Sequence, residues 1–587
     1  MFESLSKYHS IVLDYSVVFE YSKFACFGEL VSLFGSNDIE CYVDDTFKVL
    51  HYCVVAQNDP KDAHVHTAVR TLMRPLLENK KIHLVNTCNT ERFIEQIRDI
   101  NDSCILTTTK SIFAKRLREK LPKYEHDVVL VTPDGLVTYS SVAEMAENNP
   151  FPEVSKLAQI NTFLESDSSA NVGDIVTTSD GLKFNLVKRL SGGAEGMVFF
   201  TDNPKFVAKI YHKGVITPLR WAKLKKLVEL GITADGFCAP QHLLFFRNQP
   251  VGYTMPIGKG TTLSDVFDGP DAMIERFPDW TRLDICQTLL SLIGQYLYLH
   301  MHNVVAGDIQ LKNALIYTSA SHYLIDMDSV QIGNLPCPVG TEEFTDPKLW
   351  GKDFSGFVRT LQDEDYSIAM LVFSVLFCGL HPYATRRGAE TLREEIMNRN
   401  FPYTLDNSDT EHIPVGGYVH IWESLPEHLR VMLYKTFKEG YVYEAVCWRD
   451  AIQKYMNELE NCVYDNSEYY KLFPYENYPQ VTINVDEIRS MIRAQKDIRS
   501  ENAISEQLRT ASGANHAAEA SQPVVVQRPK FEKKTFANAP TGRYVSPSVS
   551  DDIRPLSFNQ QSKSSSAQGA SGKESSEPRK KKFLGLF

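Results

Sequence analysis

The chain has no Cys-x-x-Cys pair and no cluster of Cys and His at metal-ligand spacing, although it contains 11 cysteines. Scattered cysteines predict reduced, mostly buried thiols in a cytoplasmic protein and exclude a disulfide scaffold or a zinc finger. The first residues lack a charged region followed by an apolar one, so we expect no secretion signal. The most apolar run, from Tyr366 to Leu380, is shorter than the roughly 20 residues that span a bilayer. It predicts a buried helix and no transmembrane segment.

Hydrophobic residues make up 43% of the chain and aromatic residues 11%, which is enough to bury more than one core. A length of 587 residues then predicts two or three domains. Acidic residues outnumber basic ones, giving a formal net charge of -11 and a pI near 5.9. This balance argues against a general nucleic-acid coat, while it leaves room for a local basic patch.

The first 141 residues alternate short apolar runs with segments of helical period. The apolar runs are residues 10–14, 39–43, 82–85, 104–106 and 128–131. This alternation is typical of a three-layer α/β domain with a parallel sheet. Residues 142–172 are rich in Glu, Asn, Pro and Ser, which predicts a linker with one short helix near residues 154–164.

Residues 173–462 predict a second globular region of α+β type, because strand-like segments come first and longer helical patterns follow. In a C-terminal extension, residues 463–510, apolar residues recur at helical spacing and predict an amphipathic helix. They are Ile488, Met491, Ile492 and Ile498. Ser, Ala, Gln, Pro and Lys dominate residues 511–587, so we expect a disordered tail.

The tail ends in four basic residues, 579–582, followed by Phe-Leu-Gly-Leu-Phe. A basic run is most often solvated surface and nothing more. Beside an apolar terminus on a flexible tether, it equally favours a docking peptide for a partner's groove or a contact with an anionic membrane surface.

Two carboxylates and a carboxamide follow one another in the pattern that phosphoryl transfer requires. Asn313 stands five residues after Asp308, and Asp326 and Asp328 follow a short apolar run. Asp308 is suited to accept the proton of an attacking hydroxyl, while Asn313 and Asp326 are suited to share the metal ions that neutralise a nucleotide's phosphates. Asp-x4-Asn is common by chance, so the order of the motifs along the chain carries the prediction.

A glycine-rich turn precedes these residues. Gly192, Gly193 and Gly196 lie between two strand-like runs. Glycine at such a turn lets the backbone approach phosphates, and an ordinary hairpin turn has the same composition.

Lys209 stands inside the apolar run 206–211, where a bare ammonium requires negative partners. Phosphates and one carboxylate would serve. Glu229 is the only acid between Lys209 and Asp235, so we expect it to be that carboxylate. The alternative is that Glu229 is a surface residue that pairs with lysines one turn away on its own helix.

In this order the motifs resemble the bilobal protein-kinase fold, over about half of the chain. The resemblance implies that ATP binds with Mg²⁺ or Mn²⁺ and that a protein hydroxyl accepts the phosphate. Its implied catalytic residues are Asp308, Lys209, Glu229 and Asn313, its metal ligands Asn313, Asp326 and Asp328, and its nucleotide contacts Gly192, Gly193, Gly196, Val198, Ala208, Lys209, Met255 and Leu315. The motifs Gly-Gly-x-Glu-Gly and Ile-Asp-x-Asp-Ser-x-Gln are similar to those of divergent bacterial Ser/Thr kinases, some of them associated with tellurium-resistance or stress genes.

The chain departs from the family's pattern at several positions. Gly307 precedes Asp308 where the family has an arginine, so control by phosphorylation of the activation loop is not expected. Gln310 replaces a lysine, and Lys312 is the nearby candidate to substitute for it. Glu195 lies in the glycine-rich turn, where it either repels a nucleotide or pairs with a basic residue such as Lys188.

The N-terminal region resembles a PIN-like nuclease domain, in which acids at the ends of parallel strands bind Mg²⁺ or Mn²⁺. Asp14 matches the first acid and Glu91 is a further candidate, but Thr109 stands where a late Asp is expected. This depleted set favours an inactive PIN-like domain that binds RNA or protein over an active nuclease. Asp14 as a helix N-cap is the simpler alternative.

These observations lead to one hypothesis and two alternatives. The leading hypothesis is a cytoplasmic bacterial Ser/Thr protein kinase that also phosphorylates itself, with Ser564, Ser565 and Ser566 as accessible acceptors in the tail. The alternatives are a pseudokinase scaffold that binds ATP without transferring phosphate, and a PIN-type RNA-binding or nuclease protein governed by the kinase fold.

Overall fold

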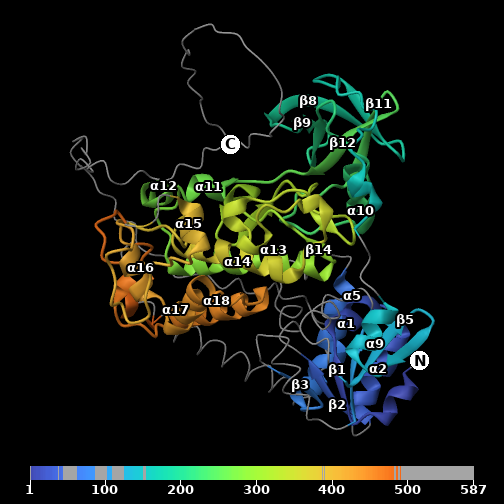
Figure 1. The fold of residues 1–587 in the computed structure, drawn as a ribbon, viewed down its shortest axis with the longest axis horizontal. Helices are drawn as coiled ribbons and strands as arrows, with labels where there is room; N and C mark the ends of the chain where they lie inside the picture. Colours follow the sequence, from blue (N-terminus) through green and yellow to red (C-terminus); the bar gives the residue numbers. More distant parts are fainter. Residues whose placement is uncertain are drawn as a thin grey trace, which may run out of the picture. The chain divides into compact units, whose positions relative to one another are not determined.

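The structure is a computed structural model that describes residues 2–36, 39–43, 62–85, 102–108, 125–149, 154–386, 388, 391–480, 484–486 and 489–490. The chain divides into two compact units, Met1–Phe531 and Glu532–Phe587, and every described element belongs to the first (Figure 1). The predicted tail and most of the predicted amphipathic helix lie outside the described residues.

The N-terminal part of the chain forms a six-stranded sheet in the order β3-β2-β1-β4-β5-β6. The first five strands run parallel, and only β6 runs antiparallel to its neighbour. A mostly parallel sheet agrees with the α/β pattern of the sequence. The strands are β1 (Ser10–Leu13), β2 (Glu40–Val43), β3 (Ile82–Leu84), β4 (Ser103–Thr107), β5 (Asp127–Thr132) and β6 (Gly135–Tyr139).

Both faces of this sheet are covered. Val12, Ile105 and Leu130 pack with Val142 and Met145 of α9. The alternate residues of the same strands belong to a separate hydrophobic cluster that includes α1 and α2. The helical elements are η1 (Glu3–Lys7), α1 (Tyr15–Tyr21), α2 (Ala25–Ser36), α5 (Ala63–Ala68), η3 (Val69–Met73), α6 (Arg74–Glu78) and α9 (Val142–Asn148). Because α9 buries residues against the sheet, the linker does not begin at residue 142.

The middle of the chain begins with a closed barrel of six strands in the order β10-β12-β11-β7-β8-β9. The short strand β7 closes it, because it pairs with both β8 and β11. Helix α10 (Pro218–Leu230) follows β10. The strands are β7 (Ile175–Thr178), β8 (Lys183–Gly192), β9 (Gly196–Thr201), β10 (Phe206–Tyr211), β11 (His242–Phe246) and β12 (Gln249–Pro256).

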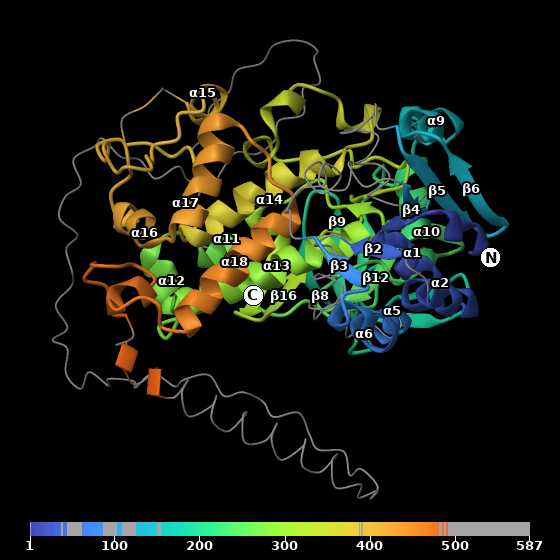
Figure 2. The same ribbon diagram turned by 90° about the horizontal axis from the view of Figure 1, so that it is seen from below.

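A helical lobe follows the barrel, and α13, α14 and α18 lie side by side at its centre (Figures 1 and 2). Its helices are α11 (Leu263–Val266), α12 (Pro270–Arg276), α13 (Arg282–Met301), α14 (Leu361–Leu376), α15 (Leu392–Met397), α16 (Tyr418–Ser424), α17 (Glu427–Tyr434) and α18 (Ala445–Glu460). Small ladders join β13 (Thr261–Thr262), β15 (Ala314–Thr318) and β16 (Ser321–Leu324), and separately β14 (Val304–Val305) and β17 (Gln331–Ile332). Short helical turns are η5 (Leu311–Asn313), η6 (Glu342–Phe344), η7 (Pro347–Leu349), η8 (Phe354–Gly356) and η9 (Lys435–Glu439).

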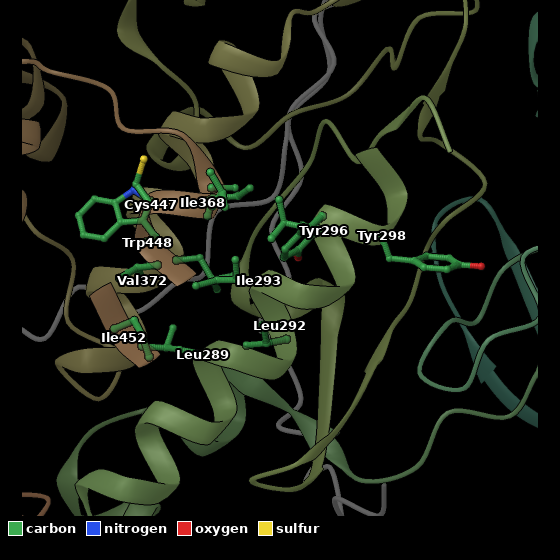
Figure 3. Close-up of a cluster of buried hydrophobic side chains, with 14 of the residues drawn as sticks. Leu289, Leu292, Ile293, Tyr296, Tyr298, Ile368, Val372, Cys447, Trp448 and Ile452 are labelled. Atoms are coloured by element: carbon green, nitrogen blue, oxygen red, sulfur yellow. The ribbon is translucent and has the colours of Figure 1, made fainter. Parts of the chain in front are cut away.

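The core of the helical lobe forms because α13, α14 and α18 present apolar residues at helical spacing. Each fully buried aliphatic side chain stabilises the fold by about 1.5–3 kcal/mol. Thr281 and Thr360 cap α13 and α14 in capping boxes that fix where the two helices begin. The packed residues include Leu289, Leu292, Ile293, Tyr296, Ile368, Val372, Trp448 and Ile452 (Figure 3).

A short 3₁₀ helix, η4 (Lys156–Gln159), lies within residues 154–164, where the sequence predicts one short helix. The boundary of the C-terminal extension needs correction. The predicted C-terminal extension begins inside the helical lobe, because Tyr470, Leu472 and Phe473 are buried beside and within η10 (Ser467–Tyr470).

The apolar run from Tyr366 to Leu380 is a buried helix, as the sequence predicts, since it falls largely in α14. Of the helices that the structure describes, none is both long and apolar enough to cross a bilayer. The nine cysteines in the described ranges are free thiols.

Candidate active site

Asp308 lies in the loop between β14 and η5, and three side chains hold its carboxylate. Asn313 Nδ2 donates to Oδ2 of Asp308 at 3.1 Å and to its backbone carbonyl at 2.8 Å. Gln310 Nε2 donates to Oδ2 at 2.9 Å, and Thr341 Oγ1 donates to Oδ1 at 2.9 Å. All three donors are neutral side chains, and together they fix the orientation of the Asp308 carboxylate.

The loop that carries Asp308 is anchored to the central helices. The N–H of Gly307 donates to Oε2 of Glu364 on α14 at 2.8 Å, and Oε1 of Glu364 lies 2.8 Å from Nε2 of His300 on α13. Gly307 has a φ of +75°, and a Cβ at this position would lie 2.7 Å from Sγ of Cys337. The conformation and the close contact both require glycine here.

A buried arginine ties the Asp308 loop to the segment that carries Thr341. The guanidinium of Arg359, which is 4% exposed, donates to the backbone carbonyls of Gly307 and Val339. The planar guanidinium offers several donors in fixed directions, so one side chain can bridge two carbonyls. Arg359 therefore fixes the position of one loop relative to the other.

Lys209, on β10, is almost completely buried and faces three carboxylates. Its Nζ lies 3.0 Å and 3.1 Å from the two carboxylate oxygens of Asp328. Oδ1 of Asp326 is 3.5 Å from the same nitrogen, and Oε2 of Glu195 is 3.9 Å away. Burial alone would lower the pKa of Lys209, but Asp328 and Asp326 hold it above its ordinary value.

The two acids of the Asp326-Met327-Asp328 segment occupy different environments. Asp328 is 1% exposed and also accepts a hydrogen bond from the hydroxyl of Tyr211. Burial would raise its pKa, but Lys209 and the other positive groups around it keep the pKa of Asp328 well below the usual range. The side chain of Asp326 is 60% exposed, and its backbone has a φ of +54°. Asp326 is thus the acid of this pair that is accessible to a bound molecule.

The side of α10 that faces these carboxylates carries cations. Nη2 of Arg220 lies 2.6 Å from Oε1 of Glu195. Three residues later, Nζ of Lys223 donates to the backbone carbonyls of Ser329 at 2.8 Å and Pro336 at 3.2 Å. Burial lowers the pKa of Lys223 to about 8. Helix α10 is therefore joined to the segment after Asp328 through Lys223.

Gly192, Gly193 and Gly196 lie where β8 ends and β9 begins, as the sequence predicts. The N–H of Gly193 donates to the carbonyl of Gly196 at 2.9 Å. A Cβ on Gly196 would lie 2.4 Å from the carbonyl oxygen of Ile210, so the close approach of β9 to β10 requires glycine. Glu195 stands in the same turn, with its carboxylate between Arg220 and Lys209.

The strand register decides which predicted nucleotide contacts share a face with Lys209. Val198 lies opposite Lys209 in the β9–β10 ladder, and Met255 lies opposite Val207 in the β10–β12 ladder. Directly opposed residues share a face of a sheet. Ala208 instead points into the barrel core, because successive residues of a strand alternate between faces. The expectation that Ala208 contacts the nucleotide is therefore corrected.

Leu315, another predicted nucleotide contact, lies on β15 close to the segment that follows β12. A Cβ on Gly258 would lie 2.8 Å from Cδ1 of Leu315 and 3.0 Å from Sγ of Cys238. Glycine at this position lets the connection between the two lobes pass close to Leu315.

Asp14, at the carboxyl end of β1, is 3% exposed. Its Oδ2 accepts hydrogen bonds from Thr107 Oγ1 at 2.6 Å and from the hydroxyl of Ser16. Asp14 is the N-cap residue of α1, but its side chain makes no capping hydrogen bond. Glu91 and Thr109 lie outside the described residues. No group of three or more potential metal-ligating side chains occurs within the described ranges.

No family model matches the chain. It is 28% identical over 312 residues to Protein kinase YegI of Escherichia coli strain K12, an alignment that covers 49% of this chain and 47% of the relative. About half of the chain is therefore similar in sequence to a protein named as a protein kinase. Protein kinase YegI of Escherichia coli O157:H7 is also 28% identical, over 299 residues, with 47% of this chain and 45% of the relative covered. The chain thus spans about half the length of the curated relatives it matches.

The structure is also similar to a solved structure, the ROP18 kinase domain in complex with AMP-PNP and sucrose. The superposition covers 49% of this chain and 85% of the ROP18 chain, with 13% sequence identity and a TM-score of 0.35.

The kinase pattern predicted the wrong carboxylate for Lys209. Glu229 is exposed, and Asp328 is the acid that lies closest to Lys209. Glu229 stands nine residues after Arg220, which is two and a half turns at 3.6 residues per turn, so it lies on the opposite side of α10. The alternative interpretation, a surface position for Glu229, agrees with its exposure.

Two further expectations concerned partners, and the structure places different residues there. Glu195 pairs with Arg220 and not with Lys188, which is exposed. Gln310 contacts Asp308, whereas Lys312, the candidate substitute for the missing lysine, is exposed.

Sequence reasoning missed Arg220, Lys223, Thr341 and Arg359. One signal was available for the first two, because Arg220 and Lys223 are spaced so that both fall on the same side of a helix. For Thr341 and Arg359 no local pattern existed, since their contacts with the Asp308 loop span 33 and 52 residues of chain.

Proposed function

We propose that the chain is an ATP-dependent Ser/Thr protein kinase of the cytoplasm. The observation that carries this proposal is the Asp308 carboxylate, held in one orientation by Asn313, Gln310 and Thr341. A carboxylate so held suits a general base that accepts the proton of a substrate hydroxyl. The relationship to Protein kinase YegI supports the same activity.

The roles of the remaining residues follow from their positions. Lys209 would hold the phosphates of ATP, and Asp328, not Glu229, would keep Lys209 in place. Asn313 and Asp326 would hold Mg²⁺ or Mn²⁺, with Asp326 preferred over Asp328 because its carboxylate is accessible. Oxygen ligands from one or two side chains plus phosphates suit Mg²⁺, which when bound neutralises charge on the phosphates.

The phosphate acceptors we propose are serine and threonine hydroxyls of protein substrates, including the chain's own Ser564, Ser565 and Ser566. The test is to incubate the full chain with Mg²⁺ and γ-³²P-labelled ATP, with a generic protein acceptor, and to identify the labelled amino acids after acid hydrolysis. We expect phosphoserine and phosphothreonine. Binding of ATP without any transfer would instead establish the ATP-binding scaffold, and labelled tyrosine alone would overturn the proposed specificity.

For the N-terminal domain we propose a PIN-like module that binds RNA or protein and does not cleave RNA. The mostly parallel sheet supports the likeness, and the hydroxyls of Ser16 and Thr107 both donate to Oδ2 of Asp14. RNA cleavage by the full chain that is lost in Asp14→Ala would overturn the inactive assignment.

Replacing Arg359 with Lys is expected to lower kcat for phosphotransfer on the order of tenfold, with the Kd for nucleotide unchanged. A single ammonium cannot reach the carbonyls of both Gly307 and Val339 as the guanidinium does, so the loops would shift relative to each other. Steady-state rates and calorimetric binding measure the two quantities. Arg247→Lys, an exchange at an exposed arginine, is the control. An unchanged kcat in Arg359→Lys would contradict a positioning role.

A further inference from the structure

The glycine-rich turn places one carboxylate between two cations of the active site. Oε1 of Glu195 lies 2.6 Å from Nη2 of Arg220, and Oε2 lies 3.9 Å from Nζ of Lys209. One anionic group that bridges an arginine and a lysine has the same pattern of contacts as a phosphate held by those two side chains. Glu195 thus pairs with the same two cations that would bind a nucleotide phosphate.

The three side chains differ in how easily they can leave. The side chain of Glu195 is 44% exposed, whereas those of Lys209 and Arg220 are 9% and 12% exposed. Glu195 can therefore rotate into water, where its carboxylate is hydrated, whereas the two cations are enclosed by the protein and cannot. A competing anion would displace the glutamate and keep both cations.

Arg220 is positioned to bind more than Glu195. Its guanidinium lies over the ring of Tyr211, 5.2 Å from the ring centroid, and Nζ of Lys209 lies over the same ring at 5.5 Å. Its second terminal nitrogen, Nη1, is buried and has no hydrogen-bond partner among the residues that the structure describes. A buried guanidinium nitrogen without an acceptor is costly, and a phosphate oxygen would satisfy it.

The balance of charge leads to the same conclusion. Lys209 and Arg220 contribute two positive charges near the nucleotide, against three negative charges from Asp326, Asp328 and Glu195. Nucleotide phosphates add negative charge. A bound metal ion would offset the negative charge of the acids that coordinate it. If a phosphate bound to Lys209 and Arg220 while Glu195 stayed nearby, the negative charge of Glu195 would have no remaining counter-charge.

We propose that Glu195 is a built-in competitor for the nucleotide phosphates, and that Arg220 is a phosphate-binding residue which Glu195 occupies until the nucleotide arrives. This inference rests on the proposed function, because it assumes that ATP binds beside Lys209. It adds a residue from α10 to the nucleotide site and assigns the glycine-rich turn a role in setting nucleotide affinity.

The rival interpretation has the opposite sign. If Glu195 served to hold Lys209 in place for the nucleotide, its removal would weaken nucleotide binding. Asp328 already holds Lys209 at 3.0 Å, closer than Glu195 at 3.9 Å, so that role is filled.

The test is calorimetric titration of the full chain with AMP-PNP and Mg²⁺. We expect Glu195→Gln to lower the Kd about tenfold and Arg220→Met to raise it about tenfold, as for gain or loss of one charged hydrogen bond. In the Arg220→Met background, Glu195→Gln should improve binding by a smaller factor, because only Lys209 remains to be released. Glu229→Gln, at an exposed site on the far side of α10, is the matched control and should leave the Kd unchanged.

Adenosine provides the second arm, since it lacks phosphates. Its Kd should be the same for wild type and Glu195→Gln. A Kd for AMP-PNP that rises or stays constant in Glu195→Gln would overturn the proposal, as would an equal improvement for adenosine. If wild type binds no AMP-PNP at all, the proposed kinase function fails first, which is a separate outcome.

Discussion

Replacing Asp308 with Asn is expected to reduce kcat for phosphotransfer by a factor on the order of 10²–10⁴, the usual contribution of a general base. The amide has nearly the same size as the carboxylate but cannot accept the proton of the substrate hydroxyl. Because Lys209 and Asp326 hold the nucleotide in this proposal, the Kd for AMP-PNP should stay close to that of wild type. Initial rates of ³²P transfer at saturating Mg²⁺ and ATP measure kcat, and calorimetry measures the Kd.

The control for this exchange is Asp268→Asn, which removes the same charge at an exposed position of the helical lobe. It should retain the activity of wild type. Wild-type activity in Asp308→Asn would contradict the assignment of the base, and so would a loss of activity explained entirely by weaker nucleotide binding.

Replacing Asp328 with Ala is expected to lower the free energy of unfolding by about 3–5 kcal/mol, the usual result of breaking a buried ion pair on one side. Lys209 would remain buried with its nearest counter-charge removed, and the hydroxyl of Tyr211 would lose its acceptor. Urea unfolding followed by intrinsic fluorescence measures the change.

The neighbouring acid provides a matched control, because Asp326 lies two residues away but its side chain is 60% exposed. We expect Asp326→Asn, which keeps a residue type that tolerates the positive φ of this position, to change the free energy of unfolding by about 0.5 kcal/mol or less, while it removes metal-dependent phosphotransfer. Equal destabilisation by both substitutions would contradict the assignment of Asp328 to stability and of Asp326 to metal binding.

The contribution of Asp328 also depends on pH, with a sign that follows from its pKa. The pKa of Asp328 is lowered in the folded protein, so its contribution to stability is fully present above the ordinary value for Asp, about 3.9, and is lost as pH falls through the folded pKa. The difference in stability between wild type and Asp328→Ala should therefore be constant near neutral pH and shrink below about pH 4. A difference that grows on acidification would contradict this.

Several residues could be placed correctly relative to one another from the sequence because their contacts are short-range. Asn313 reaches Asp308 across five residues of a tight loop, so their spacing alone implied that they meet. Gly193 and Gly196 face each other across one turn for the same reason. The alternating sheet pattern and the apolar run of α14 were also visible, because period and burial are local properties of a segment.

The sequence could not identify Asp328 as the carboxylate that pairs with Lys209. Asp328 is 119 residues further along the chain, and the choice between it and Glu229 depended on how α10 is rotated about its axis. Sequence order suggested that the missing acid lies on this helix, but the helix contributes Arg220 and Lys223 to the site instead. The prediction of Glu229 assumed that α10 contributes an acidic residue to the site, whereas in this chain the helix contributes basic residues.

The short strand β7 also has a consequence for how this molecule meets others. Open sheets expose a row of unpaired N–H and C=O groups along their margins, and these invite another chain to add a strand. Since β7 pairs with β8 on one side and with β11 on the other, it covers the edges that these two strands would otherwise present at the paired residues. A peptide therefore cannot add a strand there by β-augmentation, and recruitment to that part of the lobe must depend on side-chain recognition.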